Sequence, residues 1–276
     1  MKDIRSYKKR IISIVLVFAF CLTMVACGQV QKKAEKKKDD SLKKVLKSGK
    51  LVLGLDRNYP PMGFLADSGK IEGFDIDVAK EVCKRMGVKL KKKSIAWDEK
   101  EDELNSGSID CIWNGLSVTP EREASMSLSE PYMKNERIII VPGDSDVKAV
   151  SDLTGKKVGV QKGSTAQEAL ERSEFYEEIR EELFDDNLML IAKLKNGELD
   201  AIILDSVVAY YCIFNGDETY YVLSDSIEEE EFAIGFRKGD NVLRDKVQDI
   251  ISDMKADGSL GEISCKWFGS DITIVR

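Results

Sequence analysis

Residues 110–122 bring together a short apolar run, a glycine, hydroxyl residues and a single arginine. Residues 111–113 predict a short buried strand that ends at the Asn-Gly pair that follows. Thr119 then has the position of a helix N-cap before a proline, which places Arg122 in the first helical turn. A cation opposes the helix dipole there, whereas an anion would be held by the guanidinium and the free N–H groups. For Arg122 taken alone, a solvated arginine on an amphipathic helix is the simpler interpretation.

The elements that must position such a site alternate along the chain. Strand-like and helical runs alternate at 51–55, 76–86, 90–94, 99–106 and 111–113. Residues 136–141 predict a further strand, and residues 158–160 begin another alternating set with helices near 165–173 and 188–196. This alternation predicts βαβ units and a mostly parallel sheet. The body of roughly 225 residues has room for one large domain or two moderate ones.

Several motifs follow one another in a recognisable order. They are residues 54–61, 72–77, 110–122, 158–165, 194–205, 235–239 and 257–260. In this order they resemble the polar amino-acid-binding proteins of bacterial ABC importers, over about residues 51–268. The resemblance implies an α/β fold of the type II periplasmic-binding-protein kind, with two lobes, a hinge and an interlobe cleft.

The same resemblance implies how the chain divides. Lobe 1 would comprise residues 49–135 plus 232–276, and lobe 2 would comprise the inserted residues 136–231. The two crossings near 134–137 and 229–232 would form the hinge. We interpret the acidic run 228–231 as a solvated segment beside that hinge, without a chemical role.

The resemblance also implies a clamp for an amino-acid zwitterion, whose two charges need partners when they leave water. Arg122 would bind the α-carboxylate together with the helix N–H groups near Thr165. Asp205, at the end of an apolar strand, would bind the α-ammonium with the Gly115 carbonyl and the Ser117 hydroxyl. For Asp205 taken alone, a helix N-cap is the better interpretation.

A second group matches the family positions that surround the ligand side chain. Tyr59 and Trp97 would enclose it with aromatic faces, although core packing is an equal interpretation of Trp97. Asp56 would contact its distal end, and Arg57 beside it could neutralise that charge. The matching amide contacts are Asn114 and Gln161. This favours arginine, lysine, glutamine or cystine over glutamate and aspartate, and leaves the individual amino acid open.

The first residues predict export. Residues 1–10 are basic and residues 11–25 are apolar, which is typical of a secretory signal peptide ending at residue 26. The segment Met24-Val-Ala-Cys27 resembles a bacterial lipobox, which predicts acylation (palmitate) at Cys27 and anchoring at the outer face of the cell membrane. A membrane-spanning anchor and plain secretory cleavage are the alternatives. Residues 27–48 are polar and lysine-rich, which predicts a disordered tether.

Composition excludes several other functions. The net charge is −7 and the excess of acid lies beyond residue 50, which argues against nucleic-acid binding. The chain has no histidine, so Ser-His-Asp and Cys-His nucleophiles and His-ligated zinc are excluded. Four cysteines of the body are far apart, so we expect no metal or cofactor and leave any disulfide open: Cys83, Cys111, Cys212 and Cys265.

The sequence therefore predicts a monomeric, lipid-anchored extracytoplasmic receptor that passes a polar amino acid to the membrane permease of an ABC importer. We expect no catalytic residues. The alternative is an enzyme on the same scaffold, such as a prephenate or arogenate dehydratase, because a fold does not fix a function. A sensor domain coupled to a membrane kinase would need a transmembrane segment, and none would remain after cleavage.

Overall fold

The computed structural model describes residues 38–213, 219–224 and 228–275. The predicted signal peptide, Cys27 and the first part of the predicted tether lie outside these ranges. Within the ranges, helices are all too short or too polar to cross a bilayer. The four cysteines of the body are free thiols, and Cys83 and Cys111 are buried.

A ten-stranded sheet forms the framework of the molecule. Along its main path the strands are ordered β10-β9-β11-β8-β13-β6-β1-β5, while β12 pairs with β8 and β7 pairs with β13. Their bounds are β1 Lys50–Leu55, β5 Lys89–Ser94, β6 Cys111–Ser117, β7 Met126–Leu128, β8 Met133–Pro142, β9 Lys157–Gln161, β10 Arg180–Phe184, β11 Ala201–Asp205, β12 Tyr220–Val222 and β13 Glu228–Arg237.

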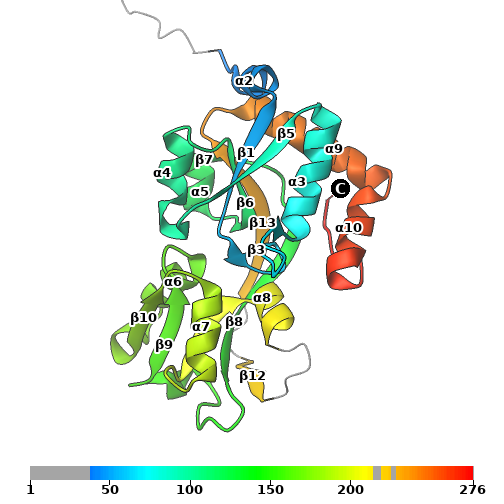
Figure 1. Cartoon of the computed structure of the whole chain (residues 1–276). Helices are drawn as coiled ribbons and strands as arrows, with labels where there is room; N and C mark the ends of the chain where they lie inside the picture. Colours follow the sequence, from blue (N-terminus) through cyan, green and yellow to red (C-terminus); the bar gives the residue numbers. More distant parts are fainter. Residues whose placement is uncertain (1–37, 214–218, 225–227, 276) are drawn as a thin grey trace, which may run out of the picture. The chain divides into compact units, whose positions relative to one another are not determined.

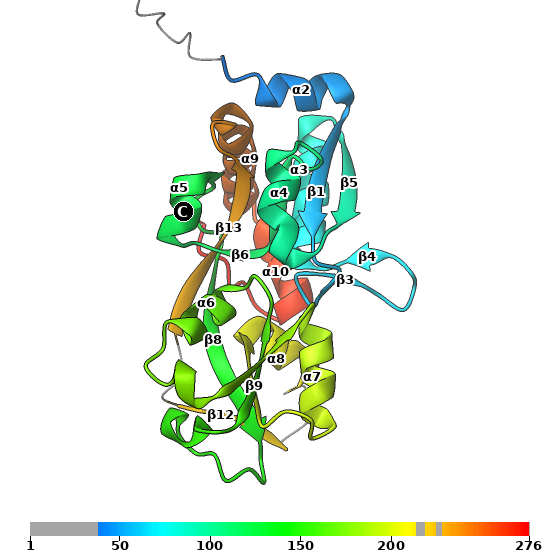
Figure 2. The same ribbon diagram turned by 90° about the vertical axis from the view of Figure 1, so that its left-hand side faces the viewer.

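Two parallel groups of strands make up the two lobes. Strand β1 is parallel to β5 and β6, and β9 is parallel to β10 and β11. The long strands β8 and β13 pair antiparallel with each other and connect the two groups, as Figures 1 and 2 show. The predicted two-lobed α/β fold is therefore confirmed, and the lobe boundaries stay a prediction.

Helices cover the sheet, and a small second sheet lies beside it. The helices are α2 Ser41–Ser48, α3 Phe74–Met86, α4 Lys100–Asn105, α5 Pro120–Ser125, α6 Thr165–Glu171, α7 Asn187–Lys195, α8 Ser206–Cys212, α9 Asn241–Ala256 and α10 Ser259–Phe268. Short 3-10 turns span Trp97–Glu99, Val150–Leu153 and Tyr176–Glu178, and the second sheet contains β2 Asn58–Tyr59, β3 Gly63–Leu65 and β4 Ile71–Glu72. Helices α3, α9 and α10 pack together in one lobe (Figure 1).

Helix α3 shows why these residues fold as they do. Apolar side chains recur at helical spacing, and Ile76, Ala79 and Cys83 are buried on one face. Gly87 ends the helix in the left-handed conformation at φ 71°. In this conformation its N–H donates to the carbonyl of Cys83. At the start of the helix, the N–H groups of Phe74 and Asp75 donate to the carbonyls of Pro61 at 2.8 Å and Met62 at 2.9 Å, which joins the helix to the segment before it.

The prediction of a disordered tether is wrong for residues 41–48. Helix α2 packs on α9 and β1, and Val45 is only 2% exposed. Ser41 Oγ accepts a hydrogen bond from Leu243 N at 3.1 Å, and Asp39 Oδ2 accepts one from Val242 N at 2.7 Å. Polar composition suggested disorder, but Leu42 and Val45 suffice to dock one short amphipathic helix on the core.

Candidate functional site

A narrow polar cavity lies where the ends of β1, β6, β9 and β11 meet the first turns of α5 and α6. All ten residues predicted to bind ligand line it, together with Ser164: Asp56, Tyr59, Trp97, Asn114, Gly115, Ser117, Arg122, Gln161, Thr165 and Asp205. The free volume between them is about 20 Å³, which is room for about one water molecule. A ligand of amino-acid size therefore fits only when the walls move apart.

Arg122 is a buried cation at one end of the cavity. Pro120 opens α5, and Thr119 Oγ1 accepts the N–H of Arg122 at 3.2 Å, as the sequence predicted. The guanidinium is 4% exposed, donates to the Ser117 carbonyl at 2.8 Å and forms no ion pair within the described ranges. Burial, followed by the charge of Arg122, lowers the pKa of nearby Lys100 to about 8. Two cations with little water around them favour an anion at this end.

The first turn of α6 faces Arg122 from the other lobe. Ser164 is the N-cap and its Oγ accepts the N–H of Gln167 at 3.2 Å, while Gly163 takes a positive φ of 71°. Thr165 begins the helix, and its Oγ1 lies 3.4 Å from Ser117 Oγ on β6. The sequence predicted the helix start near Thr165 but missed Ser164, which a Gly-Ser-Thr run before a helical pattern indicates.

Asp205 also lines the cavity, where β11 finishes. It occupies the N-cap position of α8, but its side chain makes no capping bond. Instead it accepts hydrogen bonds from Tyr59 Oη and Asn135 Nδ2. Burial and the neighbouring charge of Glu230 raise the pKa of Asp205 to about 7. The carboxylate therefore faces the cavity and lacks a full positive counter-charge, which a ligand ammonium would provide.

A second buried carboxylate, Asp56, belongs to an amide network. Its Oδ2 accepts from Gln161 Nε2 at 2.8 Å, and its backbone N–H donates to Asn114 Oδ1 at 3.0 Å. Burial raises the pKa of Asp56 to about 6. Arg57 is exposed and does not line the cavity, so the inward-turned guanidinium considered from the sequence is not seen.

The aromatic wall depends on a glycine. Gly115 has φ 60°, and a Cβ on it would lie 2.7 Å from Cε1 of Tyr59. Both Tyr59 and Trp97 are nearly buried, at 5% and 8% exposure. Trp97 also packs in a core cluster with Leu104 and Ile112, so the two interpretations of this residue hold together. A side chain at position 115 would displace the tyrosine ring from the cavity.

The interpretation of residues 228–231 as a solvated segment is wrong for Glu230. Glu228, Glu229 and Glu231 are exposed, but Glu230 is 9% exposed. It accepts hydrogen bonds from Ser117 Oγ at 3.1 Å and Thr165 Oγ1 at 2.9 Å. On a strand, residues two apart share a face, so Glu230 lies on the same face as the buried Phe232 and Ile234. This spacing in the sequence indicates that Glu230 points inward.

Asp75 is a further buried acid that the sequence did not single out. Its Oδ2 accepts from Gly115 N at 3.0 Å and Tyr132 Oη at 3.1 Å. Burial raises its pKa to about 7. It joins α3 to β6 at Gly115, which lines the cavity.

Two lysines connect the lobes at the mouth of the cavity. Lys100 Nζ donates to the carbonyls of Trp97 at 3.2 Å and Gly163 at 2.8 Å. Lys162 Nζ pairs with Asp98 Oδ2 at 2.5 Å. Each lobe therefore contributes one cation that holds a loop of the other.

Residues 51–270 match the bacterial extracellular solute-binding proteins, family 3. This chain belongs to that family. The L-cystine-binding protein TcyJ of Escherichia coli strain K12 is 32% identical over 234 residues, covering 84% of this chain and 87% of that protein. An ABC uptake transporter substrate-binding protein from Streptococcus pneumoniae with bound histidine has 35% identity and a TM-score of 0.81, covering 86% of this chain and 99% of that one.

One solved neighbour of this family 3 protein has a link to catalysis. AncCDT-1, an ancestral amino acid-binding protein and a precursor of cyclohexadienyl dehydratase, has 33% identity and a TM-score of 0.75. The match covers 83% of this chain and 99% of that one. The relatives are thus binding proteins, and one of them preceded an enzyme.

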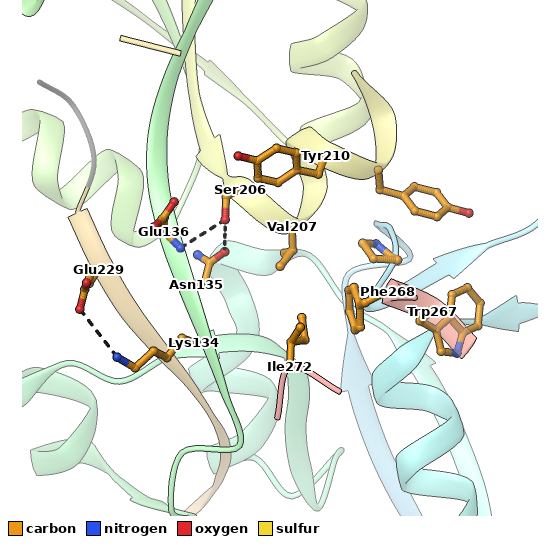
Figure 3. A pocket seen from close by; sticks show the side chains of 12 residues that line it. Lys134, Asn135, Glu136, Ser206, Val207, Tyr210, Glu229, Trp267, Phe268 and Ile272 are labelled. Carbon is orange, nitrogen blue, oxygen red and sulfur yellow. Dashed lines mark hydrogen bonds and ion pairs between the residues drawn. The ribbon is translucent and has the colours of Figure 1, made fainter. Parts of the chain in front are cut away.

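This family 3 protein has a second, larger cavity of about 560 Å³ beside β8, shown in Figure 3. Its lining is mainly apolar and aromatic: Pro61, Lys134, Asn135, Glu136, Ser206, Val207, Tyr210, Tyr211, Glu229, Trp267, Phe268 and Ile272. The only ion pair drawn there joins Lys134 and Glu229 at 4.0 Å on the exposed rim. We name it the rear groove. It lacks the buried, incompletely paired charges of the small cavity.

Proposed function

We propose that this protein binds a polar L-α-amino acid in the small cavity between its lobes and delivers it to the membrane permease of an ABC importer. The observation that carries the proposal is a pair of buried, opposite charges that line one cavity. Arg122 has no carboxylate partner among the described residues. The hydrogen-bond donors to Asp205 are neutral, and the charge of Arg137, which pairs with Glu230, has only a weaker effect on Asp205. A zwitterion supplies the missing charge at both ends.

The energetic reason is desolvation. Removing a charged group from water costs several kcal/mol per ion unless an opposite charge and hydrogen bonds replace the water. The Arg122 guanidinium and the N–H groups that begin α6 would replace it for the α-carboxylate. Asp205, the Gly115 carbonyl and the Ser117 hydroxyl would replace it for the α-ammonium.

The rest of the cavity bears on the ligand side chain. Gln161 Nε2 donates a hydrogen bond to the Asp56 carboxylate. A hydrogen-bond donor on the ligand side chain would replace this amide as the partner of Asp56. Tyr59 and Trp97 supply aromatic faces that suit guanidinium, imidazole or amide groups. We therefore propose a side chain with hydrogen-bond donors, as in arginine, lysine, histidine or glutamine, or the second ammonium group of cystine.

Closure of the lobes would be the signal that the permease reads. The proposed lobes are residues 49–135 plus 232–276 and residues 136–231, and β8 and β13 contain the crossings. Hydrogen bonds Gln161–Asp56 and Tyr59–Asp205 already join them across the cavity. A ligand that replaces these bonds with stronger charged ones would favour the closed arrangement by its differential affinity for it.

A thermal-shift screen of the mature protein tests the proposal. Each common L-amino acid, with cystine added, is tested separately, because a ligand at 100 times its Kd adds about 2.7 kcal/mol to the free energy of unfolding. We expect a rise in Tm with one or more donor-bearing amino acids. No shift with any of them would contradict the function.

The enzyme alternative rests on the kinship with the dehydratase precursor. It requires a group that protonates a leaving hydroxyl, and Asp205 or Asp56, with raised pKa, is the obvious choice. Incubation with prephenate and with arogenate, followed spectroscopically, separates the two functions. Turnover would replace the transport proposal, whereas amino-acid binding without turnover supports it.

We also propose that the protein is a lipoprotein anchored through Cys27 after removal of residues 1–26, with residues 27–40 as its tether. The support is the basic, apolar and small-residue order of the leader and the family's extracellular location. Cys27→Ser should block processing or release the protein from membranes. Unchanged cleavage and membrane retention of this variant in cell fractions would refute the anchor.

A further inference from the structure

Glu230 lies behind the cavity wall and is surrounded by hydrogen-bond donors. Oε1 accepts from Thr165 Oγ1 at 2.9 Å and pairs with Arg137 Nη2. Oε2 accepts from Ser117 Oγ at 3.1 Å and from Asn135 Nδ2 at 3.3 Å. The four donors come from β6, β8 and α6, so this carboxylate joins all three elements.

The surroundings keep Glu230 ionised. Burial alone would raise its pKa, but the charge of Arg137 and the hydrogen bonds from Arg137, Thr165 and Ser117 outweigh burial and leave the pKa below its ordinary value. Asn135 Nδ2 also donates to Asp205, so a single amide group joins the two carboxylates. Two negative charges and one arginine leave this end of the cavity with a net negative charge.

The ionised carboxylate decides where the hydroxyl protons point. Ser117 and Thr165 each have one hydroxyl proton, and a carboxylate is the strongest acceptor near either. Their oxygens approach to 3.4 Å, a contact that needs no proton if both protons go to Glu230. The Ser117 oxygen then presents only lone pairs to the cavity, where it can accept from an ammonium group.

We propose that Glu230 is a positioning residue that makes the cavity selective for ligands with an α-ammonium group. It orients the Ser117 hydroxyl as an acceptor and places a second negative charge behind Asp205. This rests on the proposed function, since it assumes that the α-ammonium lies between Ser117 and Asp205. Glu230 itself does not line the cavity.

Glutamine at position 230 has the same size and shape as glutamate but cannot accept all four hydrogen bonds. Whichever way its amide lies, the NH₂ group faces two donors, either Arg137 with Thr165 or Ser117 with Asn135. In the second orientation Ser117 accepts from the glutamine and turns its own proton toward the cavity. The chain offers a matched control in Glu228, which pairs with the same Arg137 at 2.9 Å but is 62% exposed in its side chain and contacts neither hydroxyl.

The experiment compares Glu230→Gln and Glu228→Gln with the wild-type mature protein by calorimetry. The probes are the amino acid among L-arginine, L-lysine, L-histidine, L-glutamine and L-cystine that binds the wild type most tightly, and its deamino counterpart. For arginine that counterpart is 5-guanidinopentanoate. We expect Glu230→Gln to weaken the amino acid about 30-fold or more, as for loss of a buried charge partner, and its counterpart less than about threefold. Glu228→Gln should change both by less than about threefold.

Equal losses for both probes in Glu230→Gln, or equal effects of the two variants, would overturn the inference. Ser117→Ala provides the second measurement if Glu230→Gln folds poorly. It should show the same selective loss, and in its background Glu230→Gln should have little further effect on affinity. Additive losses, or a non-selective loss in Ser117→Ala, would also overturn it. If none of these five amino acids binds the wild type, the proposed function fails first and takes this inference with it.

Discussion

The small cavity and the rear groove differ in kind. The small cavity has about 20 Å³ of free volume and contains Arg122, Asp56 and Asp205, all shielded from water. The rear groove has about 560 Å³, and Tyr210 and Tyr211 on its wall are 61% and 41% exposed. The comparison teaches that the free volume of a cavity reports the separation of its walls and does not by itself identify a binding site. Buried charges without full partners identify the walls that a ligand must join.

The strongest way to break this comparison is to remove one end of the charge pair. Arg122→Ala or Asp205→Ala would each leave one charge of a bound zwitterion buried and unpaired, at a cost of about 3–5 kcal/mol of binding free energy. The fold should persist, because both side chains face the cavity. Calorimetry measures the affinity and circular dichroism the fold. Near-native affinity in either variant would contradict the clamp.

The second prediction concerns pH. Tyr59, Asn135, Glu230 and Arg137 face Asp205, whose pKa is raised to about 7, and a ligand ammonium would lower that pKa. Binding then releases a proton below pH 7, so affinity is full above pH 7 and falls as pH decreases, by up to about tenfold per unit. Calorimetry with L-glutamine at pH 5.5, 6.5, 7.5 and 8.5 checks this. A flat profile would remove Asp205 from the ammonium site.

The third prediction concerns the ligand charge that the small cavity prefers. Asp56 should disfavour glutamate relative to arginine, because a second carboxylate would approach it with little water between. Asp56→Asn should reduce the difference in binding free energy between arginine and glutamate by about 1.5–3 kcal/mol, the range for a hydrogen bond to a charged group. Competition binding of the two amino acids measures it. Glutamate bound as tightly as arginine by the wild type would contradict the assignment.

The smallest effect belongs to the rear groove. Tyr210→Ala changes an exposed wall without touching the buried charges, so stability and amino-acid affinity should both stay within about 0.5 kcal/mol of the wild type. Thermal unfolding and calorimetry measure the two quantities. A loss of affinity comparable to that of Asp56→Asn would show that the rear groove takes part in binding.

Local sequence signals predicted one part of the site. Thr119 and the proline after it indicate a helix start, and Arg122 follows within one turn as expected. The apolar run 201–204 ends at Asp205, and the sheet does place that residue at a strand end. Tyr59, Trp97 and Gln161 came from the family resemblance, because no local pattern separates a cavity-lining aromatic or amide side chain from a core one.

Contacts between distant segments account for what the sequence could not show. Helix α2 is fixed by hydrogen bonds to residues of α9 some 200 positions later in the chain. Glu230 is buried because Asn135 lies opposite it in the β8–β13 pair and Ser117 lies within reach from β6. In an acidic run, composition indicates solvent exposure, and only the pairing of strands selects the one residue that turns inward.

The contacts made by Lys162 and by Lys100 should respond differently to the salt concentration of the medium. Lys162 and Asp98 keep side-chain exposures of 52% and 30%, so dissolved ions can screen their attraction. Lys100, bonded to the buried-side carbonyl of Gly163, is largely protected from such screening. Since the Debye length shrinks from about 10 Å at 0.1 M to about 3 Å at 1 M salt, the exposed contact weakens in brine while the sheltered one persists. The ionic strength of the medium would thus change the strength of the Lys162–Asp98 ion pair more than that of the Lys100–Gly163 hydrogen bond.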